Sequence, residues 1–308
     1  MKEYYLDSAS SAIILGIKNL KNIDIIFIPE FICKDLPISL ILSNFKIEYY
    51  KIKKNLKTDW QDLKNRLKNK KKNKVLILYV NYFSNINERN KFILLKKNKN
   101  ISLAEDNSHG FFIDIKKEKL KNIDFVVCSP KKIFNSLYSG GILYNKKNKA
   151  LNNSYSLLNY AKLKSLSVLK KNIKNNFKKN LIFKKLQNFK NKYIKNKKNS
   201  HILNKMDFVS LKYLKNINLK KEHNLKKLKI LKYKKILNNY NYSVINGHSI
   251  NNIPWYFAIL TKTTNEKKKI LKFCIKNRIT TFNWPDLPEI NYNTRTKNIF
   301  NKIICFPL

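Results

Sequence analysis

The chain has very little arginine. Only four of its 65 basic residues are arginine, at positions 66, 89, 278 and 295, and the rest are lysine. Proteins that bind nucleic acid depend on arginine for bidentate and stacking contacts. Because arginine is scarce here, the formal net charge of +46 does not by itself indicate such a protein. Lysine is mixed instead with asparagine and isoleucine throughout, as an A+T-rich coding sequence would produce. We expect no nucleic-acid partner, and a basic polyanion-binding protein is the third-ranked hypothesis.

Cysteine and long apolar runs are also scarce. The four cysteines are widely spaced and form no CxxC pair, which argues against a zinc site or a disulfide framework and favours a reducing cytoplasm. No segment approaches the ~20 apolar residues that span a bilayer. The apolar run SAIILGI near the N-terminus follows Glu3 and Asp7 and is typical of a buried helix rather than a signal peptide. We expect a soluble protein with no metal and no membrane partner.

The first half of the chain alternates short apolar runs with polar segments that suit helices. Most of the runs are continuously apolar, which is typical of strands buried on both faces of a mainly parallel sheet. The polar segment 59–72 suits an amphipathic helix. The pattern predicts an α/β fold. The predicted strands are IDIIFIPEF (23–31), FKIEYYKI (45–52), VLILYVNYF (75–83), ISLAED (101–106), IDFVVCS (123–129) and GGILYN (140–145).

The second half differs in composition. Residues 151–240 lack glycine and proline and place leucines at helical spacing, which predicts long helices. A second α/β unit follows, with strands expected in SVIN, IPWYFAILTK, ITTFNWP and KIICFPL and a helix in EKKKILKFCIKNRI. We predict a large domain over residues 1–200, with a helical extension from about 151, and a small domain over 201–308.

Three features follow one another between positions 101 and 145. Asp106 closes one apolar run, Lys132 follows the next, and Gly140-Gly141 leads into a third. Ligands bind at the carboxyl ends of strands in such sheets. A lysine amine there can form a Schiff base with the aldehyde of pyridoxal phosphate, and a carboxylate can keep the pyridine nitrogen protonated. The spacing predicts a pyridoxal phosphate site but leaves Lys131 as a competing lysine.

Other residues could complete that site. His109 follows Asp106 and could lie near the cofactor or be a structural histidine. Ser8 and Ser10, before an apolar helix, could bind phosphate, or Ser8 could only cap the helix. Ser129 could add a hydroxyl. Phe31 could stack on a flat ring or be a core aromatic, and Cys33 could take its place.

With these residues in view, the chain resembles the fold-type I, pyridoxal-phosphate-dependent aminotransferases of the DegT/DnrJ/EryC1/StrS group, in particular a polysaccharide-associated branch. The resemblance runs from Leu6 to the C-terminus and is loose in the helical middle. Its most specific part is AEDNSHG with the lysine loop and the Gly-Gly pair. The matching stretches are LDSASSAIILGIKNL, IPEFICKDLPISLILSNFKIEYYKI, LYVNYF, AEDNSHG, DFVVCSPKKIFNSLYSGGILY, FNWPDLPE and IICFPL.

The resemblance implies roles for individual residues. Lys132 matches the Schiff-base lysine, since Lys131 stands where relatives often have arginine, and Asp106 matches the partner of the pyridine nitrogen. Ser8 and Ser129 match phosphate-site positions. The implied protein is a cytoplasmic homodimer that transfers an amine from an amino acid to a nucleotide-linked keto-sugar for surface polysaccharides. Other pyridoxal phosphate reactions use the same lysine and aspartate.

The chain departs from the family pattern in three places. Ser8-Ala9-Ser10 replaces Ser-Gly-Arg, which removes a close backbone approach and a bidentate phosphate contact. The interval from Lys132 to Gly140 is about one residue longer than expected, and the chain ends where relatives continue into a helix. The alternative hypothesis is therefore a weakly active or non-catalytic homologue on the same fold.

Overall fold

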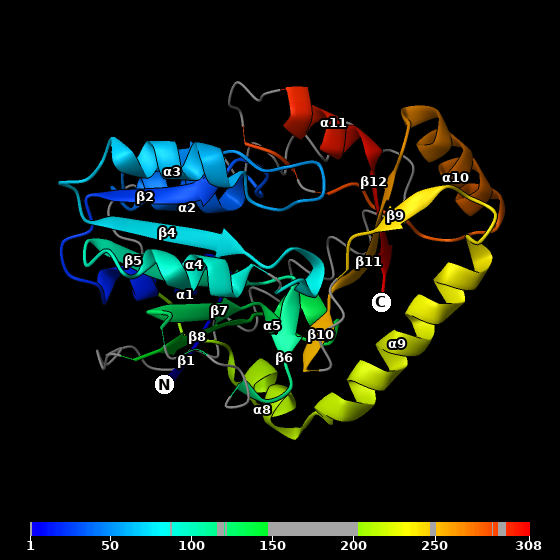
Figure 1. The fold of residues 1–308 in the computed structure, drawn as a ribbon. Coiled ribbons are helices and arrows are strands. Elements are labelled where there is room, and N and C mark those ends of the chain that lie inside the picture. The colour runs from blue at the N-terminus through cyan, green and yellow to red at the C-terminus, as the bar shows by residue number, and fades with distance from the viewer. Residues whose placement is uncertain are drawn as a thin grey trace, which may run out of the picture.

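The computed structural model describes residues 2–86, 88–115, 120, 122–146, 203–246, 251–284, 286–288 and 294–308. Its centre is a seven-stranded sheet with the strand order β1-β8-β7-β5-β4-β2-β3 (Figure 1). The strands from β7 to β3 pair in parallel, and β8 is antiparallel to both β7 and β1. These strands are β1 (Lys2–Leu6), β2 (Ile25–Pro29), β3 (Ile47–Tyr50), β4 (Val75–Val80), β5 (Ile101–Asn107), β7 (Phe125–Cys128) and β8 (Gly141–Asn145).

The strands form where the sequence is continuously apolar. Every residue of β2, β7 and β8 is buried, because helices cover both faces of the sheet and leave no face for polar side chains. The six predicted strands of this half are confirmed; β5 extends one residue beyond its predicted run, to Asn107, and the other five are shorter than their runs. Strand β1 was not predicted, and it joins the edge of the sheet beside β8.

Helices lie on both faces of this sheet (Figure 1). Apolar residues of α1 and α2 pack with one face, and residues of α3, α4 and α8 pack with the other. The helix predicted over 59–72 is α3, which begins after the side-chain cap Asp59. The helices of this part are α1 (Ala9–Lys18), α2 (Asp35–Leu42), η1 (Tyr82–Ser84), α3 (Trp60–Lys68), α4 (Arg89–Leu95), α5 (Pro130–Ile133) and α8 (Phe208–Asn216).

The C-terminal part builds a second, three-stranded sheet with the order β12-β11-β9. The long helix α9 runs from α8, beside the large sheet, toward this small sheet (Figure 1). Strand β10 pairs instead with β6 in a separate two-stranded sheet, and β6 follows β5 along the chain. The elements of this part are α9 (Leu219–Ile236), β9 (Tyr242–Val244), β10 (Asn252–Pro254), β11 (Tyr256–Thr261), α10 (Thr264–Lys276), α11 (Thr294–Lys302) and β12 (Ile303–Pro307), and β6 is Gly110–Phe112.

Two predictions for this part have different outcomes. The segment ITTFNWP (279–285) forms no named strand over the residues described in it, and only Phe282 pairs, through an isolated bridge to Cys305. The predicted helices of 151–200 lie outside the described residues, and the domain boundary at 200/201 stays a prediction. No helix in the described part of the chain is both long and apolar enough to cross a bilayer.

Candidate active site

Asp106 lies at the carboxyl end of β5, between β4 and β7 in the sheet. Its side chain is buried, with 8% of its surface exposed, and Oδ1 accepts a hydrogen bond from the backbone N of Ser108 at 2.8 Å. Burial raises the pKa of Asp106, while the positive charge of Lys132 and the hydrogen bond from Ser108 act to lower it. Lys132 is therefore the cation that most favours the ionised form of this carboxyl.

Lys132 lies in α5, the short helix that follows β7 and begins at Pro130. Its side chain is half-buried, whereas Lys131 is exposed. The charge of Lys132 acts on the pKa values of Asp106, His109 and Cys33. Its ammonium Nζ lies 4.8 Å from the ring centre of Trp255. The Lys132 head group therefore lies where several candidate site residues meet.

His109 is buried in an aromatic environment. Its ring centre lies 4.3 Å from that of Trp284 and 5.2 Å from that of Phe83, and Nδ1 accepts a hydrogen bond of 3.4 Å from the backbone N of Phe83. Burial and the charge of Lys132 hold the pKa of His109 well below its usual value. The imidazole is therefore neutral at pH 7 and adds no charge beside Asp106.

Phe31 lies after β2 and is fully buried. Its ring meets those of Tyr82 and Trp284 at 5.8 and 5.5 Å, and its carbonyl accepts a hydrogen bond from the hydroxyl of Tyr82. Its contacts are those of a core aromatic, and Trp284 lies between it and His109. Cys33 is half-buried and feels the charge of Lys132.

The segments predicted to bind phosphate lie side by side. The backbone N of Gly140 donates to the carbonyl of Asp7 at 2.9 Å, and Ser129 Oγ donates to the carbonyl of Gly140 at 3.4 Å. A Cβ at Gly141 would lie 2.0 Å from the Ser8 carbonyl oxygen, so only glycine fits there. The Gly-Gly pair therefore brings the lysine loop against the N-terminus of α1.

The predicted serines differ in what they already contact. Ser8 caps α1, since its Oγ accepts a hydrogen bond of 3.2 Å from the backbone N of Ser11 and lies 2.9 Å from Ser11 Oγ. Ser10 is half-buried in the first turn of α1. The capping role is thus present, and an added role in phosphate binding stays a prediction.

The sequence did not point to several residues that the structure brings to this site. Trp255 and Trp284 come from the C-terminal part and contact Lys132 and His109. Asn252 exchanges two side-chain hydrogen bonds of 3.0 Å with Asn107, next to Asp106. Two of the three tryptophans lie here, and their rarity is the one signal that could have drawn attention to them.

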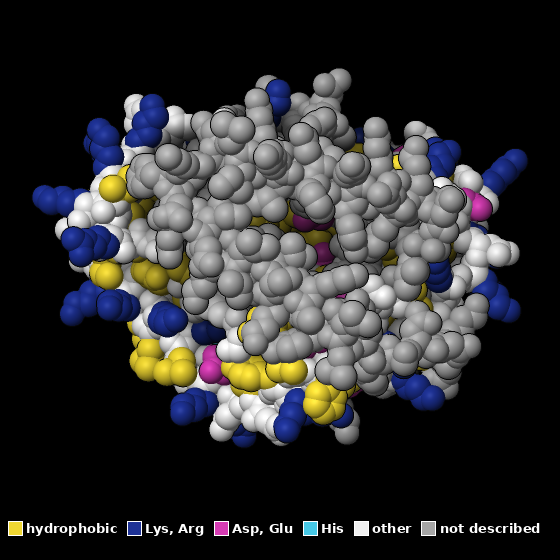
Figure 2. Space-filling model, turned by 180° about the vertical axis from the view of Figure 1, so that it is seen from behind, with side chains coloured by type: hydrophobic (Ala, Val, Ile, Leu, Met, Phe, Trp, Pro, Cys, Tyr) yellow, Lys and Arg dark blue, Asp and Glu magenta, His cyan; other side chains and the backbone are white. Residues whose placement is uncertain are grey.

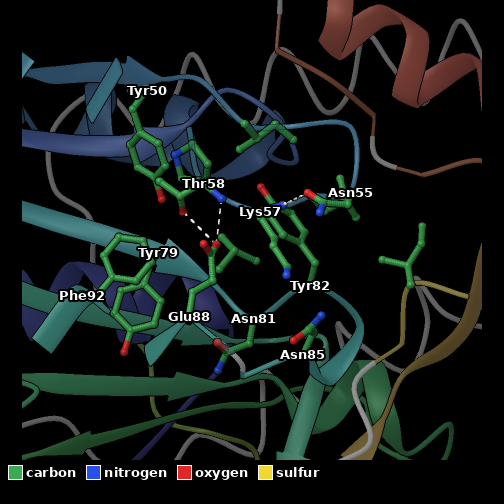
Figure 3. A pocket seen from close by; sticks show the side chains of 15 residues that line it. Tyr50, Asn55, Lys57, Thr58, Tyr79, Asn81, Tyr82, Asn85, Glu88 and Phe92 are labelled. Carbon is green, nitrogen blue, oxygen red and sulfur yellow. Dashed lines mark hydrogen bonds between the residues drawn. The ribbon is translucent and has the colours of Figure 1, made fainter. Parts of the chain in front are cut away.

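A second set of polar residues lies nearby around a small cavity of about 20 Å3 (Figure 3). Glu88 accepts hydrogen bonds there from the backbone N and the hydroxyl of Thr58, at 2.7 and 3.0 Å, and from Trp60 Nε1 at 2.8 Å. That volume holds about one water molecule. Neither Asp106 nor Lys132 lines the cavity, so it belongs to the framework of the sheet edge rather than to a cofactor site.

The residues at the Asp106 edge fit pyridoxal phosphate by their chemistry. A buried carboxylate and a lysine amine act on one another, and helix α1 presents its N-terminus and serine hydroxyls beside the lysine loop. Within the described ranges no three side chains of histidine, cysteine, aspartate or glutamate are grouped to hold a metal ion.

Comparison with solved structures identifies the fold of this chain. No protein-family model matches the chain, and no curated protein matches it in sequence. The structure is similar to that of Helicobacter pylori PseC, an aminotransferase of pseudoaminic acid biosynthesis, with a TM-score of 0.63 at 16% identity over 100% of this chain and 81% of that one. It is also similar to a DegT DnrJ EryC1 StrS aminotransferase from Brucella abortus, with a TM-score of 0.60 at 9% identity over 100% and 81%.

A third similar structure is that of NtdA from Bacillus subtilis, which was solved with the cofactor PMP bound; the TM-score is 0.61 at 15% identity over 100% of this chain and 69% of that one. All three likenesses span the whole described architecture. The chain therefore has the fold-type I fold of these pyridoxal phosphate enzymes, and the fold-class prediction is confirmed. The family resemblance predicted from the motifs holds at the level of the fold.

Proposed function

We propose that this chain is a pyridoxal-phosphate-dependent aminotransferase that acts on a keto-sugar. The observation that carries the proposal is the meeting of Lys132, Asp106 and His109 at the carboxyl edge of the sheet, in a fold shared with sugar aminotransferases. In such sheets this edge is where ligands bind. Lys132 and Asp106 are the residues that the chemistry needs.

Bound pyridoxal phosphate supplies an electron sink, through which an amino group can leave one carbon and be added to another. Lys132 would hold the cofactor through its amine, and that amine, once released, would move a proton at the reacting carbon. Asp106 would hold the ring nitrogen of the cofactor and favour its protonated form. The neutral His109 and its aromatic neighbours exclude water from this region.

The N-terminus of α1 and the serines beside it would bind the phosphate of the cofactor. Backbone N–H groups at that end, with Ser8, Ser10 and Ser129, would neutralise part of the phosphate charge. No arginine stands in this segment, so the anchor is weaker than one that contains a bidentate side chain.

The finer assignments are those that the family resemblance of the sequence implies, and we propose them here. The acceptor is a keto-sugar linked to a nucleotide, the donor is an amino acid, and the product enters surface polysaccharide. The protein works in the cytoplasm as a homodimer. These assignments extend the proposal to the substrate and the assembly.

One observation favours a second candidate, a non-catalytic homologue with the same fold. Ser8 Oγ is already engaged in capping α1, and Ala9 and Ser10 stand where the resembling branch has glycine and arginine. A basic polyanion-binding protein has less support, because lysines are spread nearly evenly along the sequence, and the described lysine and arginine side chains in view lie in separate groups (Figure 2).

Titration of the purified protein with pyridoxal phosphate tests the proposal. We expect a new absorbance band on the order of 330–420 nm, and a borohydride-reduced adduct on the peptide that contains Lys132. Lys132→Ala should abolish both, whereas Lys131→Ala, one residue away, should retain them. Addition of an amino acid donor should then change the band. A wild-type protein with no band or adduct would refute the enzyme and support the non-catalytic homologue.

A further inference from the structure

Trp255 presents the face of its indole to Lys132. The lysine Nζ lies 4.8 Å from the centre of the ring, well within the distance at which an ammonium is attracted to an aromatic face. Tryptophan is the side chain that makes this contact most strongly. The two residues come from opposite halves of the chain, so the tertiary fold alone brings them together.

The backbone around Trp255 is fixed to the large sheet. Its N–H donates to the carbonyl of His109 at 3.0 Å, and β10, which ends just before it, pairs with β6. Asn252 and Asn107 exchange two hydrogen bonds of 3.0 Å. A Cβ at Gly110 would lie 2.5 Å from Asn252 Oδ1, so the two segments are packed as closely as glycine allows.

The indole is itself held in place. Its ring stacks on that of Tyr256, with ring centres 4.2 Å apart and planes at 21°, and it lies 5.4 Å from the ring of His109. A half-buried ring with these neighbours has little rotational freedom. The surface offered to Lys132 is therefore rigid.

Three groups that feel the charge of Lys132 are Asp106, His109 and Cys33. Of these, Asp106 can carry a negative charge that attracts Lys132, whereas the buried imidazole of His109 is neutral at pH 7. A carboxylate binds an ammonium through its N–H groups, whereas an indole face attracts the charge without accepting a directed hydrogen bond. The indole can therefore hold the head group and leave its N–H groups for the substrate.

We propose that Trp255 is the positioning residue for Lys132, and that its indole face holds the lysine head group whenever the lysine is not bonded to the cofactor. The inference rests on the proposed function and adds to it a role for the C-terminal part of the chain. A free lysine on a flexible stem would otherwise lose the orientation that proton transfer requires.

The first experiment needs no cofactor. Trace labelling with acetic anhydride, followed by peptide mass spectrometry, measures the reactivity of Lys132 relative to Lys131 in the same digest. We expect Trp255→Leu to raise this ratio roughly threefold to tenfold, because loss of the ring frees the amine. Trp255→Phe keeps an aromatic face and should restore most of the protection. Equal ratios in wild type and Trp255→Leu would overturn the proposal.

Trp284→Leu is the matched control. Trp284 lies against His109 and within the same aromatic cluster, at 4.3 Å between ring centres, and its partners there are rings rather than the lysine. It should leave the Lys132 ratio unchanged. An increase as large as that of Trp255→Leu would mean that the cluster, and not the indole under Lys132, protects the amine.

The second experiment uses the cofactor. Stopped-flow absorbance of the cofactor-loaded protein mixed with an amino acid donor should show that the band changes about tenfold more slowly in Trp255→Leu than in wild type, with Trp255→Phe in between, because the released lysine no longer keeps the orientation that proton transfer requires. Wild-type protein that never attaches the cofactor would refute the proposed function, and the labelling ratio would still decide the role of Trp255. A normal rate of the band change in Trp255→Leu together with an unchanged labelling ratio would refute the role of Trp255 alone.

Substitution of the lysine instead of the tryptophan tests the same contact if Trp255→Leu does not fold. Lys132→Gln removes the cation from the indole and should change the tryptophan emission, whereas Lys131→Gln should not. Identical emission spectra for the two variants would contradict the contact.

Discussion

Glu105 and Asp106 are adjacent on β5, but they lie on opposite faces of the strand and in different electrostatic conditions. Glu105 is fully buried and accepts hydrogen bonds from Tyr79 Oη and Asn81 Nδ2, both at 2.7 Å. Arg89 adds two more, from Nε at 2.8 Å and from Nη2 at 2.6 Å. This carboxylate has a cation and a full set of donors in the framework.

Asp106 lacks such a set within the described part of the chain. Its carboxylate accepts a hydrogen bond from the backbone N of Ser108, and its cation is the half-buried Lys132, on a neighbouring helix. Burial raises its pKa, and the charge that most opposes this shift is that of Lys132. The difference indicates that Glu105 holds β5 in place, while Asp106 keeps acceptor capacity for a ligand.

The strongest test of this difference is Arg89→Met. It leaves the buried Glu105 carboxylate without its cation, which should lower the free energy of unfolding by about 3–5 kcal/mol. Denaturant titration measures the loss. Arg66→Met is the control, because Arg66 pairs with Asp62 at 2.8 Å in a partly exposed i,i+4 position and should cost less than about 1 kcal/mol.

A second variant locates the cause of that loss. In Arg89→Met/Glu105→Gln the uncompensated charge is gone, so much of the stability should return. If Arg89→Met costs no more than Arg66→Met, the Glu105 face does not hold the strand and the contrast between the two carboxylates fails.

A smaller effect is expected from Asp106→Asn. Because burial raises the pKa of Asp106 above that of the unfolded chain, the native state binds a proton where the unfolded state does not, and wild-type stability falls as pH rises through this window. The variant lacks this penalty. It should be more stable than wild type by about 1 kcal/mol at pH 7, and no more stable at a pH below ~3.8. It should also bind pyridoxal phosphate more weakly.

Asp62→Asn should show the opposite sign. Burial acts to raise the pKa of Asp62, but hydrogen bonds from Arg66 and from the backbone N of Lys51 lower it overall. Its contribution to stability is present above the unfolded pKa and is lost on acidification. The variant should therefore be less stable than wild type at pH 7. Equal signs for the two substitutions would break the comparison.

The central sheet could be predicted because burial on both faces leaves a clear mark in the sequence. The apolar runs that became β2, β4, β5 and β7 need no knowledge of their partners. Strand β1 mixes exposed and buried residues and gains its order by pairing with β8 and, at Leu6, with Lys205, both far along the chain. The segment 279–285 has apolar residues but finds a single bridging partner.

The candidate site divides in the same way. Asp106 and Lys132 could be predicted because the first lies at the end of one buried strand and the second lies in the loop region after another, which are local features. Arg89 and Trp255 could not be predicted, because the role of each depends on a contact that only the tertiary fold makes. Arg89 contacts Glu105, and Trp255 contacts Lys132. The sequence also left open whether His109 is structural or functional. Its burial among aromatic rings accounts for its place in the fold without deciding its role.

The smallest effect concerns His109, which follows β5 along the chain. Burial lowers its pKa well below 6.5, so on acidification the unfolded chain takes up a proton before the native chain does. Wild type should therefore lose stability as pH falls below ~6.5, and His109→Gln should lack this part of the loss, about 1 kcal/mol at pH 5.5. Lys132→Met removes a positive charge near His109. The loss of stability with falling pH should therefore be slightly less steep in this variant than in wild type. If His109→Gln retained the full acid sensitivity, the imidazole would be charged in the native state, and Asp106 would then have a second cation and lose its contrast with Glu105.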